Sequence, residues 1–165
     1  MDSFFIRPET PGEVRAIFDV HCQAFAQDGE ARLVDALRDD GEISPNLSLV
    51  AVHDNRIIGH ILFCPISIDS EEATVPATAL APLAVHQDYQ CRGIGAALVQ
   101  EGLDECRRCG ERIVIVVGHP TYYPRFGFTP ASEWGIHAPF PCPDETFMAL
   151  GLEEGALDGV SGTVH

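Results

Sequence analysis

The 165-residue chain contains no lysine, and its ten basic residues are all arginines. A Walker A loop requires Gly-x4-Gly-Lys-Ser/Thr, so the missing lysine excludes that class of nucleotide site. The chain also lacks an apolar run of the ~18–20 residues that a membrane helix needs. Its first residues show neither the basic region nor the apolar core of a secretory signal. We therefore expect a cytoplasmic protein with no membrane partner.

Acidic residues outnumber basic residues by 25 to 10, which gives a formal net charge of −15. Such a surface repels a phosphate backbone, so we expect no nucleic-acid partner. The same charge would favour a cationic substrate such as an amine. Solubility or a salt-rich cytoplasm is the better explanation of the acidity.

The cysteine pattern does not indicate a metal or redox site. Cys106 and Cys109 form a lone Cys-x-x-Cys pair, whereas a structural zinc site needs a second pair of ligands. The pair also falls near the end of a predicted helix, and a thioredoxin-type pair activates its thiol at a helix N-terminus. We expect no bound metal and reduced thiols.

The most informative segment is the loop Gln90-Cys91-Arg92-Gly93-Ile94-Gly95, which lies between an apolar strand and a predicted helix. Glycines at such a turn let a ligand approach the backbone closely, because no Cβ stands in the way. Turn amides and a helix N-terminus direct N–H groups toward one point, which suits a phosphate. Arg92 can add a charge-assisted contact. The pattern therefore predicts a pyrophosphate-binding loop.

A dinucleotide-binding fingerprint does not fit this loop. That fingerprint requires a third glycine and an acidic residue about 20 residues further on. Here Gly95 is followed by Ala96-Ala97-Leu98, and the next strand ends in Gly118-His119. A nicotinamide cofactor is therefore not expected.

Two blocks of sequence resemble a known family. LAPLAVHQDYQCRGIGAALV, residues 80–99, resembles the acetyl-coenzyme A segment of the GNAT superfamily of N-acetyltransferases. GHPTYYPRFGF, residues 118–128, resembles the family's segment after the next strand, where a tyrosine lies five residues before the final phenylalanine. Residues 59–68 and 145–164 further resemble one bacterial and archaeal subgroup of uncertain substrate, so the resemblance covers nearly the whole chain.

The resemblance implies one N-acetyltransferase domain, residues 1–165, with the three-layer α/β sandwich of the family. Its central mixed, mostly antiparallel sheet would be twisted and splayed at the cofactor strand. Acetyl-coenzyme A would be the cosubstrate, and the acetyl group would pass directly to a primary amine in a ternary complex. Either a monomer or a homodimer fits this picture.

The resemblance also assigns roles to residues. Gln90, Cys91, Arg92, Gly93, Ile94 and Gly95 would bind the pyrophosphate, and Leu83, Ala84 and Val85 would pair with the pantetheine arm. Tyr123 would be the general acid that protonates the departing thiolate. Tyr122 would lie beside the cofactor and could substitute for Tyr123.

Hydrophobic periodicity independently predicts an α/β fold with one central sheet. The expected strands are residues 4–7, 47–53, 56–68, 76–85 and 113–117, with weaker candidates at 146–150 and 160–164. The expected helices run from Pro11 to about Phe25, from Gly29 to Gly41, and from the glycine loop to Gly110. A loop is expected at residues 130–144, which contain four prolines.

Several details follow from residue types within these elements. Asp54-Asn55 is a hairpin turn signal, and Pro82 predicts a bulge or splayed pairing in its strand. The first helix should bury a stripe made of Val14, Ile17, Phe18, His21 and Phe25. The second helix should bury Leu33, Val34 and Leu37. Val99, Leu103 and Cys106 should be the buried stripe of the third helix.

The sequence does not identify the base that deprotonates the amine. Many GNAT proteins carry a glutamate on the strand before the loop, but residues 79–82 contain no acid. The candidates are His60, His86, Glu71 and Glu72, and a chain of water molecules is an equal alternative. His86 also fits a cap and His60 a hydrogen-bonded core residue.

Other residues and functions stay open. His119 could line the acetyl pocket, and Trp134 and Phe140 could either wall the substrate site or close the core. A non-catalytic acyl-coenzyme A sensor and a transferase for a longer acyl group are the rival functions. The identity of the amine is not readable from the residues.

Overall fold

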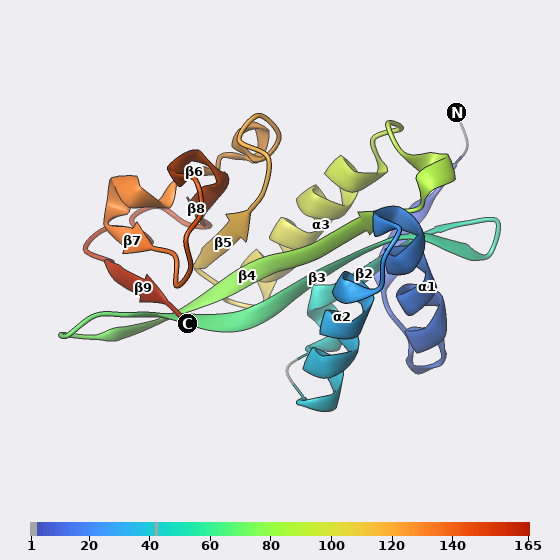
Figure 1. The fold of residues 1–165 in the computed structure, drawn as a ribbon, viewed down its shortest axis with the longest axis horizontal. Helices are drawn as coiled ribbons and strands as arrows, with labels where there is room; N and C mark the ends of the chain where they lie inside the picture. The colour runs from blue at the N-terminus through green and yellow to red at the C-terminus, as the bar shows by residue number, and fades with distance from the viewer. Residues whose placement is uncertain (1–2, 42) are drawn as a thin grey trace. The chain divides into compact units, whose positions relative to one another are not determined.

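A computed structural model describes residues 3–41 and 43–165 (Figure 1). Within these ranges the α-helices are α1 (Val14–Phe25), α2 (Gly29–Asp39) and α3 (Ile94–Arg108). The strands are β1 (Phe5–Pro8), β2 (Ser48–His53), β3 (Arg56–Asp69), β4 (Thr74–Val85), β5 (Ile113–Val117), β6 (Thr129–Pro130), β7 (Ile136–His137), β8 (Phe147–Gly151) and β9 (Gly162–Val164). They form one mixed sheet in the order β1-β2-β3-β4-β5-β8-β6, with β9 paired to β3 and β7. The predicted α/β class with a mixed, mostly antiparallel sheet is confirmed.

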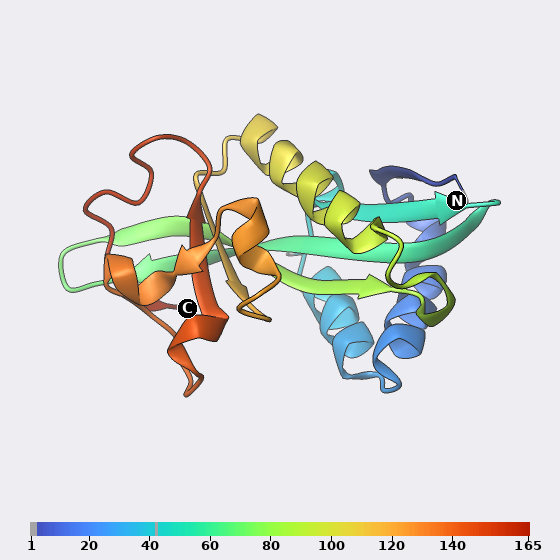
Figure 2. The same cartoon turned by 90° about the horizontal axis from the view of Figure 1, so that it is seen from above.

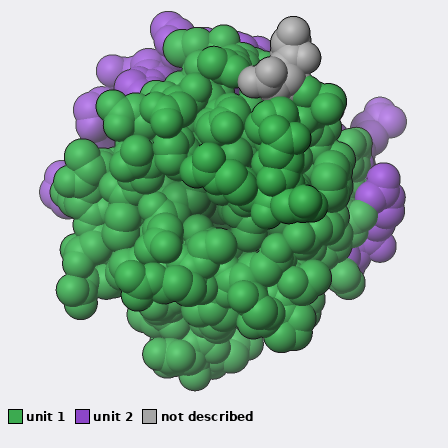
Figure 3. All heavy atoms as spheres, turned by 90° about the vertical axis from the view of Figure 1, so that its right-hand side faces the viewer, with its two compact units in different colours: residues 1–64, 81–105 green, residues 65–80, 106–165 purple. Residues whose placement is uncertain are grey.

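The chain forms two compact units, which Figure 3 distinguishes by colour. The first unit comprises residues 1–64 and 81–105, and the second comprises residues 65–80 and 106–165. Strands β3 and β4 each contribute residues to both units. The expectation of a single acetyltransferase domain stays a prediction.

The first unit has three layers. On one face of β3, Leu62 packs with residues of α1 and α2 in a core that also includes Ile17 and Val34. On the other face, Phe63 lies against Gly102 of α3. Figure 2 shows α3 and the α1–α2 pair on opposite sides of the strands. This sandwich follows from side-chain alternation along a strand that is buried on both faces.

The hairpin between β2 and β3 turns at Asp54 and Asn55, as the sequence predicted. Both residues have positive φ, 48° and 62°, which Asp and Asn tolerate better than most residues. The hairpin then continues as an antiparallel ladder that pairs Val50 with His60.

In the second unit, β5 pairs in parallel with β4 through Thr78↔Val114 and Ala79↔Ile115. On its other edge, β5 pairs with β8 over its whole length. β4 runs on to Val85, beyond the two pairs of its ladder with β5. The peptide bond between Ala81 and Pro82 is cis.

Some expectations about local structure were wrong. Phe25 and Leu33 are 40% and 45% exposed, although both were expected in buried stripes, and α1 buries Val20 instead. The expected loop at residues 130–144 contains the short strand β7 and a 3-10 helix, Ala131–Trp134. In both cases tertiary contacts that local spacing does not report decided the outcome. The stripe of α3 is correct, because Val99, Leu103 and Cys106 are each at most 1% exposed.

No helix in the described ranges is long and apolar enough to cross a membrane. None of the six cysteines forms a disulfide, so no such bond joins Cys106 to Cys109. Among the described residues, no three His, Cys, Asp or Glu side chains are grouped as metal ligands.

Candidate functional site

The glycine loop of the first unit connects β4 to α3. The N–H of His86 donates to the carbonyl of Ile58 at 2.7 Å, which continues the strand pairing past Val85. The side-chain amide of Gln90 then donates to the carbonyl of Val85 at 3.0 Å and ties the loop to the strand. Strand, turn and helix thus follow one another as expected, and the 15-residue α3 presents its N-terminus at this turn.

Two residues of the loop have a left-handed backbone. Gly93 has φ +83° and Cys91 has φ +63°. Gly95 lies in the first turn of α3 and is not among the glycines with positive φ. At Gly93 an added Cβ would meet no atom within 4 Å, so backbone conformation, and not crowding within the protein, favours glycine there.

The Arg92 side chain lies over an aromatic ring. Its guanidinium carbon is 5.5 Å from the centre of the Tyr89 ring, a cation–π distance. The ring of His86 approaches the same tyrosine edge-on, at 5.8 Å between centres. Arg92 and Gly93 are both exposed, so the loop carries a cation at the surface.

The end of β4 alternates in burial. Ala84 is 2% exposed, whereas Leu83 and Val85 are half-buried. Leu83 and Val85 therefore lie on one face of the strand and Ala84 on the other. Their expected pairing with pantetheine stays a prediction.

In the second unit, Tyr123 begins a 3-10 helix, Tyr123–Phe126, soon after β5 ends. Its ring is 8% exposed and lies edge-on to Phe128 at 5.8 Å. A Cβ added to Gly118 would be 2.3 Å from this ring, so only glycine leaves it room. Burial raises the pKa of the Tyr123 hydroxyl to about 12, and Tyr122 adds to that shift. The hydroxyl therefore keeps its proton at neutral pH, as a general acid must.

Tyr122 differs from its neighbour in exposure and contacts. Its ring is half-buried, and the guanidinium carbon of Arg125 lies 4.5 Å from the ring centre. Burial raises its pKa, while the positive charge of Arg125 acts in the opposite direction. The two tyrosines are thus distinguishable by substitution.

The candidates for the base lie in unlike environments. His60 is fully buried, and both of its ring nitrogens are engaged by protein side chains. His86 accepts a hydrogen bond on Nδ1 from the N–H of Asp88 at 3.1 Å, so it caps the short helix Gln87–Tyr89. Glu71 and Glu72 are exposed in the turn between β3 and β4. The base stays unassigned among them.

The two aromatic residues proposed for a substrate wall line different hollows of the second unit. Trp134, 37% exposed, borders a hollow of about 240 Å³ and donates a long hydrogen bond to Thr129. Phe140, 49% exposed, borders another of about 250 Å³ and packs edge-on against Phe147. His119 is exposed at the surface.

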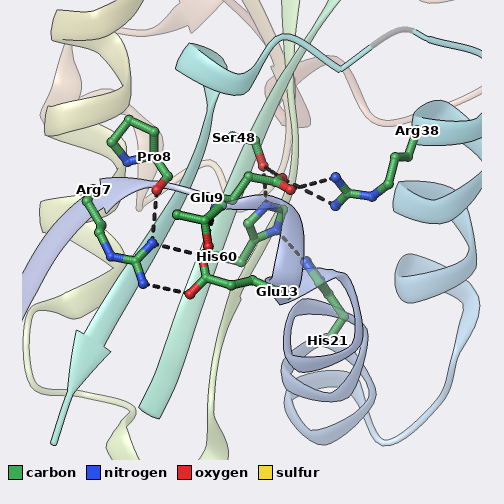
Figure 4. Close-up of polar contacts among 9 residues, drawn as sticks. Arg7, Pro8, Glu9, Glu13, His21, Arg38, Ser48 and His60 are labelled. Carbon is green, nitrogen blue, oxygen red and sulfur yellow. Dashed lines mark hydrogen bonds and ion pairs between the residues drawn. The ribbon is translucent and has the colours of Figure 1, made fainter. Parts of the chain in front are cut away.

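A buried polar chain in the first unit escaped the sequence analysis (Figure 4). It links five side chains by hydrogen bonds, in the order Arg38, Glu9, Ser48, His60 and His21. The members come from α2, the segment after β1, β2, β3 and α1. No spacing in the sequence connects them, although His60 had been considered as a hydrogen-bonded core residue.

Comparison with known families gives a match over most of the chain. A family model described as an acetyltransferase (GNAT) domain matches residues 5–131. The N-acetyltransferase YhbS of Escherichia coli K12 is 36% identical over 161 residues, which is 97% of this chain and 94% of that protein. The N-acetyltransferase YjhQ of the same organism is 42% identical over 130 residues, 78% of this chain and 72% of that protein.

Two solved structures are similar in sequence and in fold. The crystal structure of Escherichia coli YhbS in complex with CoA has a TM-score of 0.91 and 34% identity, and it covers 99% of this chain and 89% of that chain. A GNAT acetyltransferase from Brucella melitensis in complex with acetyl-CoA has a TM-score of 0.80 and 31% identity, with 99% and 96% covered.

Proposed function

Because the chain belongs to the GNAT acetyltransferase family, we propose that it transfers an acetyl group from acetyl-coenzyme A directly to a primary amine. The observation that carries this proposal is the CoA complex of the Escherichia coli structure, since 99% of this chain aligns with it at a TM-score of 0.91. The loop between β4 and α3 supplies the local reason, because it combines a helix N-terminus, an exposed arginine and a left-handed glycine.

In the proposed complex, the amides at Gly93 and the start of α3 bind the pyrophosphate, and Arg92 pairs with its charge. Contact of Arg92 with the Tyr89 ring limits the rotamers of a long side chain before the ligand arrives. Leu83, Ala84 and Val85 lie next to this loop in sequence and would hold the pantetheine arm.

The proposed reaction has three proton movements. A neutral amine attacks the thioester carbonyl, the carbon–sulfur bond breaks, and an amide and coenzyme A are formed. The ammonium form of the amine must first lose a proton, because it has no lone pair with which to attack. Tyr123 donates its hydroxyl proton to the departing thiolate, and the proton that the attacking nitrogen loses as the amide forms restores the tyrosine hydroxyl.

A pair of glycine variants tests the cofactor loop. Gly93 and Gly110 have φ +83° and +84°, and an added Cβ meets no atom within 4 Å at either position. Gly93→Val and Gly110→Val therefore impose similar backbone strain, but only Gly93 lies in the loop. Calorimetric titration with coenzyme A should show binding lost in Gly93→Val and retained in Gly110→Val. Unchanged affinity in folded Gly93→Val would refute the loop assignment.

A second measurement tests the reaction itself. The purified protein is mixed with acetyl-coenzyme A and a panel of primary amines, and free thiol is measured over time. Thiol release that depends on one of the amines supports the transferase. Tight coenzyme A binding without release, for any amine or acyl group tried, would instead favour an acyl-coenzyme A sensor.

A further inference from the structure

The buried polar chain of the first unit has an unusual composition for a protein core. His21, Ser48 and His60 are each 0% exposed, and the Glu9 side chain is 6% exposed. Arg38, at the other end, keeps 24% of its side chain exposed. Burial of so many polar groups is unfavourable unless each has a partner.

The direction of each hydrogen bond follows from the carboxylate. An ionised carboxylate only accepts, so the Ser48 hydroxyl must donate to Glu9. The Ser48 oxygen then accepts from Nε2–H of His60, at 2.8 Å. Arg38 also donates to Glu9, at 2.5 and 3.2 Å, which holds the carboxylate in place. The backbone N–H of Glu9 bonds to the Ser48 carbonyl at 2.9 Å and aligns the two residues.

The same reasoning determines which ring nitrogen of His60 and of His21 carries the proton. With its proton on Nε2, neutral His60 has a lone pair on Nδ1, which accepts from Nε2–H of His21 at 2.8 Å. His21 then has a lone pair on Nδ1, and that buried nitrogen has no hydrogen-bond partner among the described residues. Burial lowers the pKa of His21 to about 4 and that of His60 well below 6.5, which agrees with two neutral rings at pH 7.

We propose that His21, His60, Ser48 and Glu9 form a proton relay, which takes up one proton at Nδ1 of His21 and delivers it to the carboxylate of Glu9. The proton binds at Nδ1 of His21, and Nε2–H of His21 passes to Nδ1 of His60. Nε2–H of His60 passes to Ser48, whose own hydroxyl proton passes to Glu9. Both rings end as neutral Nδ1–H tautomers, Ser48 is again a hydroxyl, and Glu9 is a neutral acid.

Charge burial explains why the relay is preferred to a simple imidazolium. A proton that stayed on His21 would place a charge on a fully buried ring. After transfer, the net positive charge belongs to Arg38, whose guanidinium reaches water. The charged groups that face the two rings from the surrounding elements are Glu9 and Arg38. Arg7, on β1, and Glu13, the residue before α1, form a separate ion pair (Figure 4).

Nuclear magnetic resonance of 15N-labelled histidine tests this, because long-range 1H–15N spectra report which ring nitrogen carries the proton. At pH 7 both rings should be Nε2–H tautomers. On acidification both should change to Nδ1–H with one shared midpoint. Separate midpoints, an imidazolium at His21 or His60, or unfolding before any change would overturn the relay.

Substitution of Glu9 separates proton delivery from packing. Glu9→Gln keeps an oxygen that accepts from Ser48, but an amide does not take up a proton over the pH range of the titration. The shared change of tautomer should disappear, and the midpoint of proton uptake at His21 should fall by at least about one pH unit, a tenfold loss of proton affinity. The matched control is Glu153→Gln, which removes the same charge from an exposed pair with Arg112 and should leave both rings unchanged.

A second variant answers the case in which Glu9→Gln fails to fold. Ser48→Ala leaves the Glu9–Arg38 pair intact but interrupts the relay, so it should also abolish the shared midpoint. Its control is Ser132→Ala, which removes an exposed hydroxyl that donates to Asp144 at 2.9 Å. A shared midpoint that survives in Ser48→Ala would overturn the proposal. None of these measurements requires an amine or acetyl-coenzyme A.

Discussion

The Tyr123→Phe variant tests the chemistry most directly. The substitution keeps a ring that is packed against Gly118 and Phe128 and removes only the hydroxyl. No described residue forms a hydrogen bond with that hydroxyl, so the free energy of unfolding should change by less than about 0.5 kcal/mol. If the hydroxyl protonates the thiolate, kcat should fall about 100-fold, which corresponds to about 2.7 kcal/mol of transition-state stabilisation. Coenzyme A affinity should barely change.

The assay is steady-state release of coenzyme A thiol with an amine found in the substrate panel. Tyr122→Phe is the internal control. The Tyr122 ring lies against Arg125, and the decrease in kcat of this variant should be far smaller. The deficit of Tyr123→Phe should shrink at low pH, where solvent protonates the thiolate more readily. Equal losses in both variants, or none in either, would show that the motif alignment selected the wrong residue.

Three predictions concern stability. Gly102→Ala should destabilise the protein by about 1–3 kcal/mol in chemical denaturation, despite the better helix propensity of alanine, because its Cβ would lie 2.2 Å from the buried Phe63 ring. Proton uptake at His21 in the folded chain has a pKa lowered from 6.5 to about 4, so the unfolded chain binds more protons in this range wherever the relay then places the proton; about 3 kcal/mol of stability, complete above pH 6.5, should be lost as pH falls to 4. Urea melts at stepped pH would show it, and a His21→Gln variant should lose much of the dependence. With 25 acidic against 10 basic residues, the melting temperature should rise from low to molar potassium chloride as self-repulsion is screened; a flat response would contradict this.

Much of the fold, including the strand, turn and helix around residues 90–95, could be predicted because the signals are local. The spacing of apolar residues identified α3 and its buried stripe, since one helix face recurs every three to four residues. Asp54 and Asn55 indicated a turn because their own side chains tolerate its backbone. Likewise the loop Gln90–Gly95 was recognisable from six consecutive residues between a strand and a helix.

Other features depended on contacts between segments far apart in the chain. Phe25 has the spacing of a buried residue, yet it lies at the C-terminal end of α1 and is 40% exposed, with its ring stacked on that of His21 at 6.2 Å between centres. Gly118 appears in sequence as an ordinary strand end, and only the packed ring of Tyr123 shows why a side chain cannot replace its hydrogen.

The residues alone determined the family and most of the order of the elements, because each of these is encoded in continuous stretches of chain, whereas phosphate binding by the loop Gln90–Gly95 stays a prediction. Only the tertiary structure decided the partners of the buried polar groups. Glu9, Ser48, His60 and His21 lie on four separate elements and meet only after β1, β2, β3 and α1 have packed. The direction of their hydrogen bonds depends on a carboxylate that no neighbouring residue in the sequence reveals.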